Sequence, residues 1–226
     1  MRKKIIIIKF IFIFTFLISI QTTFNFLKES EISRKINDRY NIHPQSSGTN
    51  LAWIYRSEGA IWSVDISSDG KYLVAGSNDD KVYFFENSNS TPLWSYNTGN
   101  NVQTVAISSN GNYIVAGSSI GKIYLFNKSV ATLKTPLWSY QTAIKVVQDV
   151  AISSDGKYIA VAGGDNKIYL FNNSITTPKT PMWNFLRSDT PNSVSISADG
   201  NYIVAGGYDS YVYLFNNSIS TPKLPI

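Results

Sequence analysis

The chain has 226 residues, no cysteine and a formal net charge of +5. A chain of this length buries a sizeable core without disulfides, and the lack of cysteine excludes thiol catalysis and thiolate metal sites. Residues 1–40 hold eight Lys and Arg against three Asp and Glu, so the net charge lies there and the rest is neutral. A nucleic-acid-binding domain usually has a clustered basic excess, so we expect no nucleic-acid partner.

The N-terminal segment has the pattern of an export signal or a membrane anchor. Three basic residues at positions 2–4 precede a mostly apolar run from Ile5 to Ile20. The stretch Phe10–Leu27 has 18 residues, or about 27 Å of helix, which is just enough to cross a bilayer. No Ala-x-Ala cleavage pattern follows. We therefore expect a hydrophobic helix over 1–27, an uncleaved signal anchor rather than a cleaved signal peptide. The rest of the chain would then lie outside the cell, either on a single membrane pass or secreted.

Residues 28–50 are polar and mixed in charge, and they are predicted to form a linker or stalk. Pro44 and the run Ser46-Ser47-Gly48 would end any short helix within it. His43, the only histidine of the chain, lies in this segment. A lone histidine in a linker is a poor candidate for catalysis or metal binding.

Four copies of one sequence unit follow the linker. The block Ser63–Gly76 recurs nearly unaltered, and the turn glycines of the four copies are 41, 45 and 44 residues apart. An apolar block follows each copy, and a third block containing tryptophan follows three of them. The turn glycines are Gly70, Gly111, Gly156 and Gly200; the apolar blocks are Val82–Phe85, Ile123–Phe126, Ile168–Phe171 and Val212–Phe215; the tryptophan blocks are Pro92–Tyr96, Pro136–Tyr140 and Pro181–Phe185.

These short blocks, rich in β-branched and aromatic residues, predict β-strands. The Asp-Gly or Asn-Gly pair between the first two supplies the positive φ of a tight hairpin. Four strands in about 44 residues make one propeller blade. Since amphipathic helices are absent from this part of the sequence, we expect an all-β fold, a β-propeller of four-stranded antiparallel blades over residues 51–226. The expected repeats are about 61–100, 101–144, 145–190 and 191–226, with 51–56 a lone fourth strand.

The repeats resemble WD-repeat propellers and the related blades of pyrroloquinoline-quinone-dependent dehydrogenases, across residues 51–226. The resemblance rests on the pattern Ser-x-Asp-Gly-x-Tyr-(Leu/Ile)-(Val/Ala)-x-Gly. The Gly-His pair of WD repeats is missing, and residues such as Phe126-Asn127 replace the Trp-Asp ending. The buried His–Asp network of that family is therefore not expected here. The recurring fourth-strand tryptophan is similar to that of the quinoprotein blades, where it docks one blade onto the next.

Closure of the ring is left open by the sequence. Leu51–Tyr55 matches the fourth-strand block, whereas the last copy ends at Thr221–Ile226, where the other copies place their tryptophan. The N-terminal strand has the phase to complete the last blade and close a four-bladed ring. The alternative, which we favour because such wedges usually build larger rings, is an open arc. It would be a fragment of a larger propeller or half of an eight-bladed dimer, with two bare blade faces that seek a partner.

The aromatic residues offer one candidate for ligand contact. Trp53, Trp94, Trp138 and Trp183 have the same phase in every repeat, which favours packing over a sugar- or amine-binding cage. Trp62 breaks this phase, because the other copies have Gln103, Gln148 and Asn192 at its position. It is the aromatic residue that we expect to contact a ligand.

The sequence shows no catalytic constellation. Asp69, Asp155 and Asp199, with Asn110 in the second copy, lie in predicted hairpin turns, where Asp is favoured for its backbone hydrogen bonds. Asp79, Asp80, Asp165 and Asp209 lie in the next turn, and only Asn78-Asp79-Asp80 comes near a calcium-binding spacing. No Ser–His pair or phosphate-binding glycine loop occurs. We expect no cofactor, no metal site and no enzymatic activity.

Two opposite rims are predicted for the propeller. The loops between third and fourth strands hold Asn-x-Ser/Thr sequons, candidate glycosylation sites in an exported protein, at Asn89, Asn127, Asn172 and Asn216. The opposite rim would then bind the partner, and its candidate residues are Arg56, Trp62, Asn100, Gln103, Gln148, Arg187 and Asn192.

The resulting hypothesis is an exported or membrane-anchored module that binds a protein or a glycan. One alternative is a quinone-dependent or other propeller enzyme, which would need acids, Arg or metal ligands converging near the axis. The other is a surface protein that self-assembles into homo-oligomers through its bare blade faces.

Overall fold

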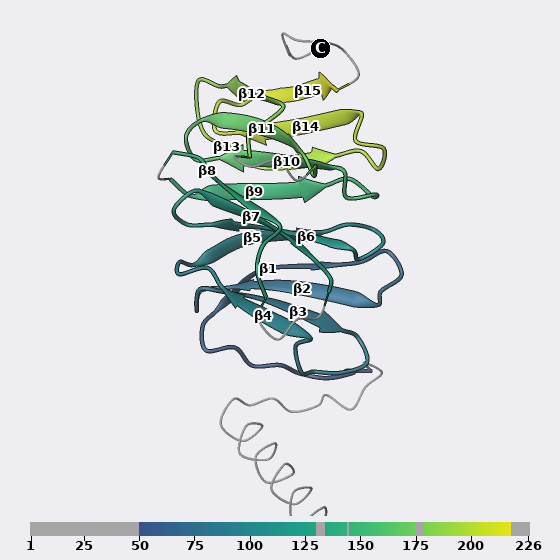
Figure 1. The fold of residues 1–226 in the computed structure, drawn as a ribbon. Coiled ribbons are helices and arrows are strands. Elements are labelled where there is room, and N and C mark those ends of the chain that lie inside the picture. The colour runs from purple at the N-terminus through teal and green to yellow at the C-terminus, as the bar shows by residue number, and fades with distance from the viewer. Residues whose placement is uncertain (1–49, 130–133, 144, 175–178, 218–226) are drawn as a thin grey trace, which may run out of the picture. The chain divides into compact units, whose positions relative to one another are not determined.

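The computed structural model describes residues 50–129, 134–143, 145–174 and 179–217 (Figure 1). The chain divides into two units, Met1–Ala52 and Trp53–Ile226, and the fold below is that of the second. The predicted hydrophobic helix over 1–27 and the linker up to residue 49 lie outside the described residues. In the part that the structure describes, no helix is long and apolar enough to cross a membrane.

The described part of the second unit is all-β, as predicted, and it consists of four antiparallel sheets. We call each sheet a blade. Blade 1 comprises β1 (Ile61–Ile66), β2 (Tyr72–Ser77), β3 (Lys81–Glu86) and β4 (Trp94–Asn97); blade 2 comprises β5 (Val102–Ile107), β6 (Tyr113–Ser118), β7 (Lys122–Asn127) and β8 (Trp138–Gln141); blade 3 comprises β9 (Val147–Ile152), β10 (Tyr158–Gly163), β11 (Lys167–Asn172) and β12 (Trp183–Leu186); blade 4 comprises β13 (Pro191–Ile196), β14 (Tyr202–Gly207) and β15 (Val212–Asn216).

The hairpin between the first and second strands of each blade has the predicted turn chemistry. In blade 1, Gly70 has a φ of 69°, in the left-handed region that favours glycine. Asp69 accepts hydrogen bonds from the Ser67 hydroxyl (2.6 Å) and the Lys71 amide (3.0 Å). The same arrangement recurs in the other three blades, with Asn110 as the acceptor in blade 2. The Asp and Asn residues of these turns therefore shape the backbone.

The blades stack face to face along the unit (Figure 1). We call the face that packs on the next blade in chain order the downstream face, and the other the upstream face. Three core clusters each join the downstream face of one blade to the upstream face of the next. The fourth-strand tryptophan crosses every junction, with ring centroids 5.2–5.6 Å from a phenylalanine of the next blade. The predicted packing role is thus confirmed for Trp94, Trp138 and Trp183.

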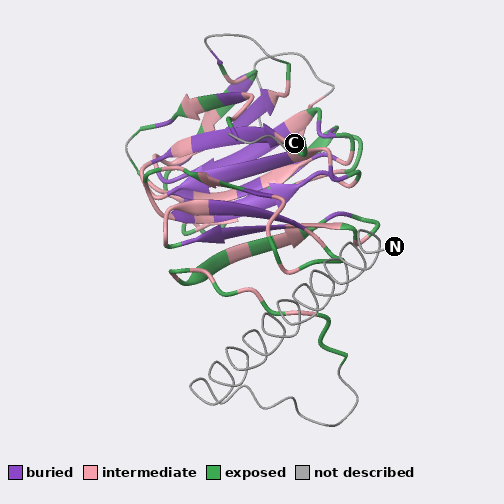
Figure 2. Cartoon of the chain, turned by 60° about the horizontal axis from the view of Figure 1, so that its bottom comes forward, coloured by how far each residue is buried: buried purple, intermediate pink, exposed green. Residues whose placement is uncertain are grey.

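Among the described residues, the two terminal blades each have one face that no other blade covers, as the exposed residues in Figure 2 show. On the upstream face of blade 1, Val64 is 70% exposed, whereas its counterparts Val105, Val150 and Val194 are each 5% exposed. On the downstream face of blade 4, Val212 is 80% exposed, and its counterparts Val82, Ile123 and Ile168 are fully buried. The described blades therefore form an open arc.

The segment predicted as a lone fourth strand differs from expectation. Trp53 and Tyr55 lie on the upstream face of blade 1, with ring centroids 5.5 and 5.0 Å from Phe85, and the Trp53 indole donates a hydrogen bond to the Asn87 carbonyl (2.7 Å). The described residues of this segment are in no sheet, and β15 has no fourth strand beside it among them. The segment thus packs on blade 1 as a fourth strand would, but it is not hydrogen-bonded to a described third strand.

Candidate interaction surface

One rim of the arc is built from the loops between blades and the turns between second and third strands. Backbone hydrogen bonds join them at each junction: the Thr98 amide to Asp80 (2.8 Å), the Thr142 amide to Gly121 (3.0 Å) and the Arg187 amide to Asn166 (2.8 Å). We call this the interblade rim. Its described residues are 57–60, 98–101, 142–143, 145–146 and 187–190, with the turns 78–80, 119–121, 164–166 and 208–211.

The structure brings four of the predicted site residues to one equivalent position. In blade 2, Val102 pairs with Ser118 and Thr104 with Gly117, so that Gln103 lies opposite no residue and forms a β-bulge. The same register shift occurs in the other three first strands. A bulge interrupts the ladder and re-aims a side chain, and these first strands are neighbours from blade to blade. We call the four bulge residues the bulge row: Trp62, Gln103, Gln148 and Asn192.

Trp62 is the only aromatic member of the bulge row. It is 55% exposed, whereas the blade-docking tryptophans of β4, β8 and β12 are buried. Gln103 and Gln148 are half-buried, and Asn192 is exposed. The row therefore combines one large apolar ring with three amide side chains that both donate and accept hydrogen bonds.

The remaining predicted rim residues are placed differently. Arg56 is exposed, and Asn100 is half-buried, with its carbonyl accepting from the Thr98 hydroxyl. Arg187 is buried; it forms an ion pair with Asp209 and its guanidinium lies 4.7 Å from the centroid of the Tyr213 ring. This guanidinium braces the blade 4 end of the rim from within and is not presented to solvent. Sequence reasoning missed its partner because the two residues lie in different loops.

Three Asp–Tyr pairs lie beneath the interblade rim, and sequence reasoning missed them. The hydroxyl of Tyr83 donates to Asp79 (2.7 Å), that of Tyr213 donates to Asp209 (3.0 Å), and Tyr169 donates to Asp165 in the same way. The spacing Asp-x-x-x-Tyr, present in three of the four repeats, was the available signal. These pairs tie the second turn to the third strand in blades 1, 3 and 4, whereas in blade 2 the Tyr124 hydroxyl donates to the Thr98 carbonyl (3.1 Å).

The Asp79 carboxylate is held in its charged form. Burial acts to raise the pKa of Asp79, but hydrogen bonds from the Tyr83 hydroxyl and from the amides of Glu58 and Lys81 outweigh it and keep the pKa below the usual 3.8. Burial and the same carboxylate raise the pKa of Tyr83. With its oxygens engaged in this way, Asp79 serves as a turn cap. In the described ranges, no group of three or more His, Asp or Glu side chains is placed to hold a metal ion.

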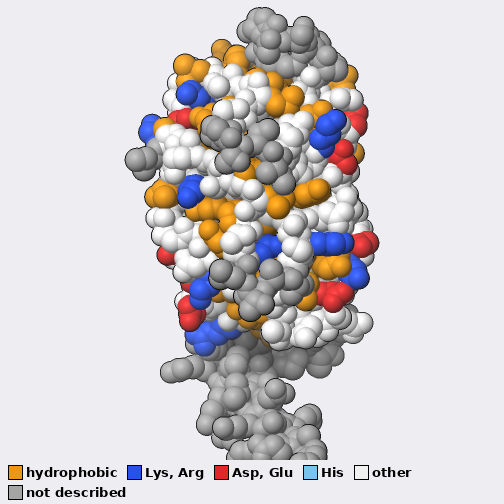
Figure 3. Space-filling view, in the orientation of Figure 1, with side chains coloured by type: hydrophobic (Ala, Val, Ile, Leu, Met, Phe, Trp, Pro, Cys, Tyr) orange, Lys and Arg blue, Asp and Glu red, His pale blue; other side chains and the backbone are white. Residues whose placement is uncertain are grey.

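The sequons lie on the opposite rim, where Asn127, Asn172 and Asn216 end the third strands β7, β11 and β15 and Asn89 follows β3. Asn89 is exposed, and Asn127 and Asn172 are half-buried. Beside Asn127, the Lys134 ammonium donates to its side-chain oxygen (2.9 Å) and lies 4.7 Å from the centroid of the Trp94 ring. On the side of the molecule seen in Figure 3, basic and acidic side chains are interspersed, without a continuous basic patch.

Comparison with known families agrees with this architecture. The family model described as WD domain, G-beta repeat, matches residues 50–86, 90–127, 134–172 and 183–216. These segments cover more than half of the chain. The chain belongs to the WD40 repeat family. A comparison with curated proteins found no match.

The WD40 segments are offset from the blades by one strand. The match over 90–127 contains β4 and then β5 to β7, so one repeat supplies the fourth strand of one blade and three strands of the next. The first WD40 match begins at residue 50 and includes Trp53 and Tyr55, which dock on blade 1. WD40 propellers typically act as protein-interaction scaffolds rather than enzymes, which supports an interaction module here.

Proposed function

We propose that this WD40 chain is a binding module that recognises a protein partner through the bulge row, with Trp62 as the anchor. The observation that supports it most is the exposure of this tryptophan in a row where the other blades have amides. Tryptophan is enriched among the residues that dominate binding energy at protein interfaces. The neighbouring amides suit the peptide groups of a protein partner, which offer both donors and acceptors.

The test is site-specific photo-crosslinking in the cells that make the protein. A photoreactive amino acid at Gln103 should give a protein adduct, and Trp62→Ala should lower its yield at least tenfold. The matched control is the same probe at Lys157, an exposed residue of the opposite rim, which should give no adduct. Equal adducts from both positions, insensitivity to Trp62→Ala, or a glycan in place of a protein would contradict the proposal.

We further propose that the module is displayed outside the cell by its N-terminal segment. Support comes from the basic residues 2–4 followed by an apolar run, and from the confinement of the net charge to residues 1–40. Protease added to intact cells should degrade the blades, and a tag at the N-terminus should stay in the carbonate-washed membrane fraction. Protection of the blades from the protease would contradict the display.

A further inference from the structure

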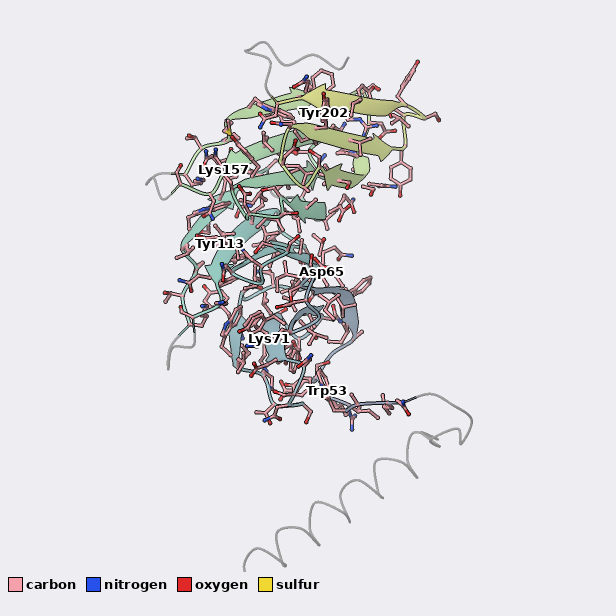
Figure 4. The ribbon with its side chains drawn as sticks, turned by 90° about the vertical axis from the view of Figure 1, so that its right-hand side faces the viewer. Trp53, Asp65, Lys71, Tyr113, Lys157 and Tyr202 are labelled. Atoms are coloured by element: carbon pink, nitrogen blue, oxygen red, sulfur yellow. The ribbon has the colours of Figure 1, made fainter. Side chains whose placement is uncertain are left out.

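We propose that the downstream face of blade 4 docks on the upstream face of blade 1 of a second copy, and that two copies close a ring of eight blades. The two faces lie at opposite ends of the arc; in Figure 4, Trp53 marks the blade 1 end and Tyr202 the blade 4 end. The three junctions within the chain show which side-chain and backbone contacts join two blades. For the contacts described below, blade 4 has one partner exposed and blade 1 has the other.

The blade 4 face presents the side chains that are buried at the other junctions. Val204, Val212 and Leu214 are all exposed, whereas their counterparts in blades 1 to 3 are fully or almost fully buried. Contiguous exposed apolar surface on a soluble domain indicates an interaction site. In blades 1 to 3, the corresponding apolar residues are buried against the next blade.

The blade 1 face offers a groove for these side chains. It has a volume of about 520 Å³ and is mostly apolar. Trp53 and Tyr55 form one wall and Ile61, Val64 and Ile66 form another. At the internal junctions, the corresponding space between the docked fourth strand and the first strand is filled by the second and third strands of the preceding blade.

A tyrosine–glycine contact provides an independent match. At the internal junctions, the second-strand tyrosine lies against the hairpin glycine of the next blade, so close that a Cβ on Gly111, Gly156 or Gly200 would come within 2.3–2.5 Å of the ring. Within the described ranges, Gly70 of blade 1 has nothing within 4 Å of its Cβ position, and Tyr202 of blade 4 is exposed. Each is the partner that the other lacks.

The glycine near the end of the second strand gives a further match between blade 4 and blade 1. A Cβ on Gly76 would lie 2.7 Å from the Val102 side chain, and one on Gly117 would lie 2.4 Å from Val147. A Cβ on the equivalent Gly206 of blade 4 would meet only the Tyr211 carbonyl oxygen, at 4.0 Å, among the described residues. The residue of blade 1 that corresponds to these valines is Ile61, which is exposed.

The unpaired strand segments complete the match. In blade 3, Trp183 pairs with Leu170 and Phe185 with Ile168. By the same register, Trp53 and Tyr55 of one copy would pair with Leu214 and Val212 of the other, giving blade 4 its fourth strand. Such a head-to-tail contact forms a closed ring only at a fixed number of copies, and two copies of four blades reach the upper end of the four-to-eight range of known propellers.

Disulfide trapping tests the contact, because the chain has no cysteine of its own. Full-length Ile61→Cys and Gly206→Cys variants, each with a tag of different size, are purified in detergent, mixed and oxidised with copper phenanthroline. We expect a covalent heterodimer on a non-reducing gel. Ser95→Cys, exposed in β4, replaces Gly206→Cys in the control and should give none. Absence of the Ile61–Gly206 heterodimer, or a cross-link within one chain when both cysteines are on it, would overturn the proposal.

Native mass spectrometry of the full-length chain tests the direction of contact and the copy number. The wild type should be a dimer, and Val64→Asp and Val212→Asp should each weaken dimerisation at least tenfold. An equimolar mixture of the two variants retains one intact pair of faces, so it should recover a heterodimer. A wild-type monomer, longer oligomers, or a Val212→Asp variant that still dimerises would each contradict the head-to-tail ring. Circular dichroism confirms that both variants are folded.

Discussion

At the residue scale, contacts repeated at every junction explain why the repeats are so alike. The aromatic ring of Tyr72 needs a glycine at 111, and the turn that contains this glycine needs its φ of 67°. Gly111 thus permits both the hairpin turn of its own blade and the close contact with Tyr72 of the preceding blade. Turn geometry alone would explain the Asp-Gly or Asn-Gly pairs, and only the structure shows the contact with the preceding blade.

Gly111→Ala should therefore cost more stability than an alanine at a glycine with the same backbone. Gly99 has a φ of 76° and no described residue within 4 Å of its Cβ position, so Gly99→Ala should cost about 1 kcal/mol from the backbone alone. Gly111→Ala adds a clash with the Tyr72 ring, and overpacking of this kind costs a further 1–3 kcal/mol or so. Urea denaturation of both variants measures the difference; equal losses would refute the stacking contact.

Asp79 should make stability depend on acid. Its folded-state pKa lies below the usual 3.8, so its contribution is present above pH 3.8 and is lost as the pH falls through the folded-state value. Asp79→Asn should cost about 1–3 kcal/mol at neutral pH, because hydrogen bonds to the charged carboxylate are weakened. The difference from wild type should shrink as unfolding is measured at lower pH. A difference that is constant down to pH 2 would contradict this role.

Single residues also mark where sequence reasoning stops. The exposure of Trp62 follows from its broken phase, because a tryptophan at a position of amides is unlike the docking tryptophans. The burial of Arg187 does not follow, since its partner Asp209 is 22 residues away and only the meeting of two loops brings them together. The Asp–Tyr pairs were visible as a spacing, but nothing in a spacing says which way the tyrosine points.

At the element scale, the fourth strands β4, β8 and β12 belong to one sheet and also dock on the next blade. β8 is four residues long, and its Trp138 packs on Phe171 of the next blade (5.6 Å between centroids). The WD40 repeat keeps this strand together with the three strands that it docks on. The recurrence of the tryptophan block therefore predicted the strand and its packing role correctly.

Trp138→Ala should be strongly destabilising, by about 3–5 kcal/mol, because it leaves a cavity at the junction of blades 2 and 3. Trp62→Ala is the matched control: it removes the same side chain from a mostly exposed position and should change stability by about 0.5 kcal/mol or less. Thermal and urea unfolding of both variants measures this contrast. Similar losses for the two would mean that Trp62 is a core residue.

The element that sequence reasoning placed incorrectly is the first one. The pattern of Trp53 and Tyr55 predicted a strand, and their rings do occupy the docking position of a fourth strand. A ladder, however, needs a neighbouring edge, and the described edge that matches, β15, lies at the other end of the arc. The local sequence pattern predicts which blade face a segment packs on. It does not show which strand, if any, the segment pairs with.

At the scale of the whole molecule, each repeat specifies a blade. Whether the four blades form a closed ring is shown by the burial or exposure of the terminal faces. Val64 and Val212 have the same sequence environment as buried residues elsewhere, so no local pattern distinguishes them from core. Their exposure is a property of the arc as a whole. The sequence left open whether the four blades form a closed ring or an open arc. The exposure of these two faces shows that the described blades form the arc.

The most direct test of the open arc is a comparison of two distances within one chain. Spin labels on cysteines at positions 62 and 103 report neighbouring blades, and labels at 62 and 192 report the terminal blades, at equivalent bulge positions. Labelled chain is diluted into excess unlabelled chain, so that only distances within one copy are measured by double electron–electron resonance. The open arc predicts that the 62–192 distance clearly exceeds the 62–103 distance. Equal distances would mean that blades 1 and 4 are neighbours in a closed four-bladed ring, and would contradict the account.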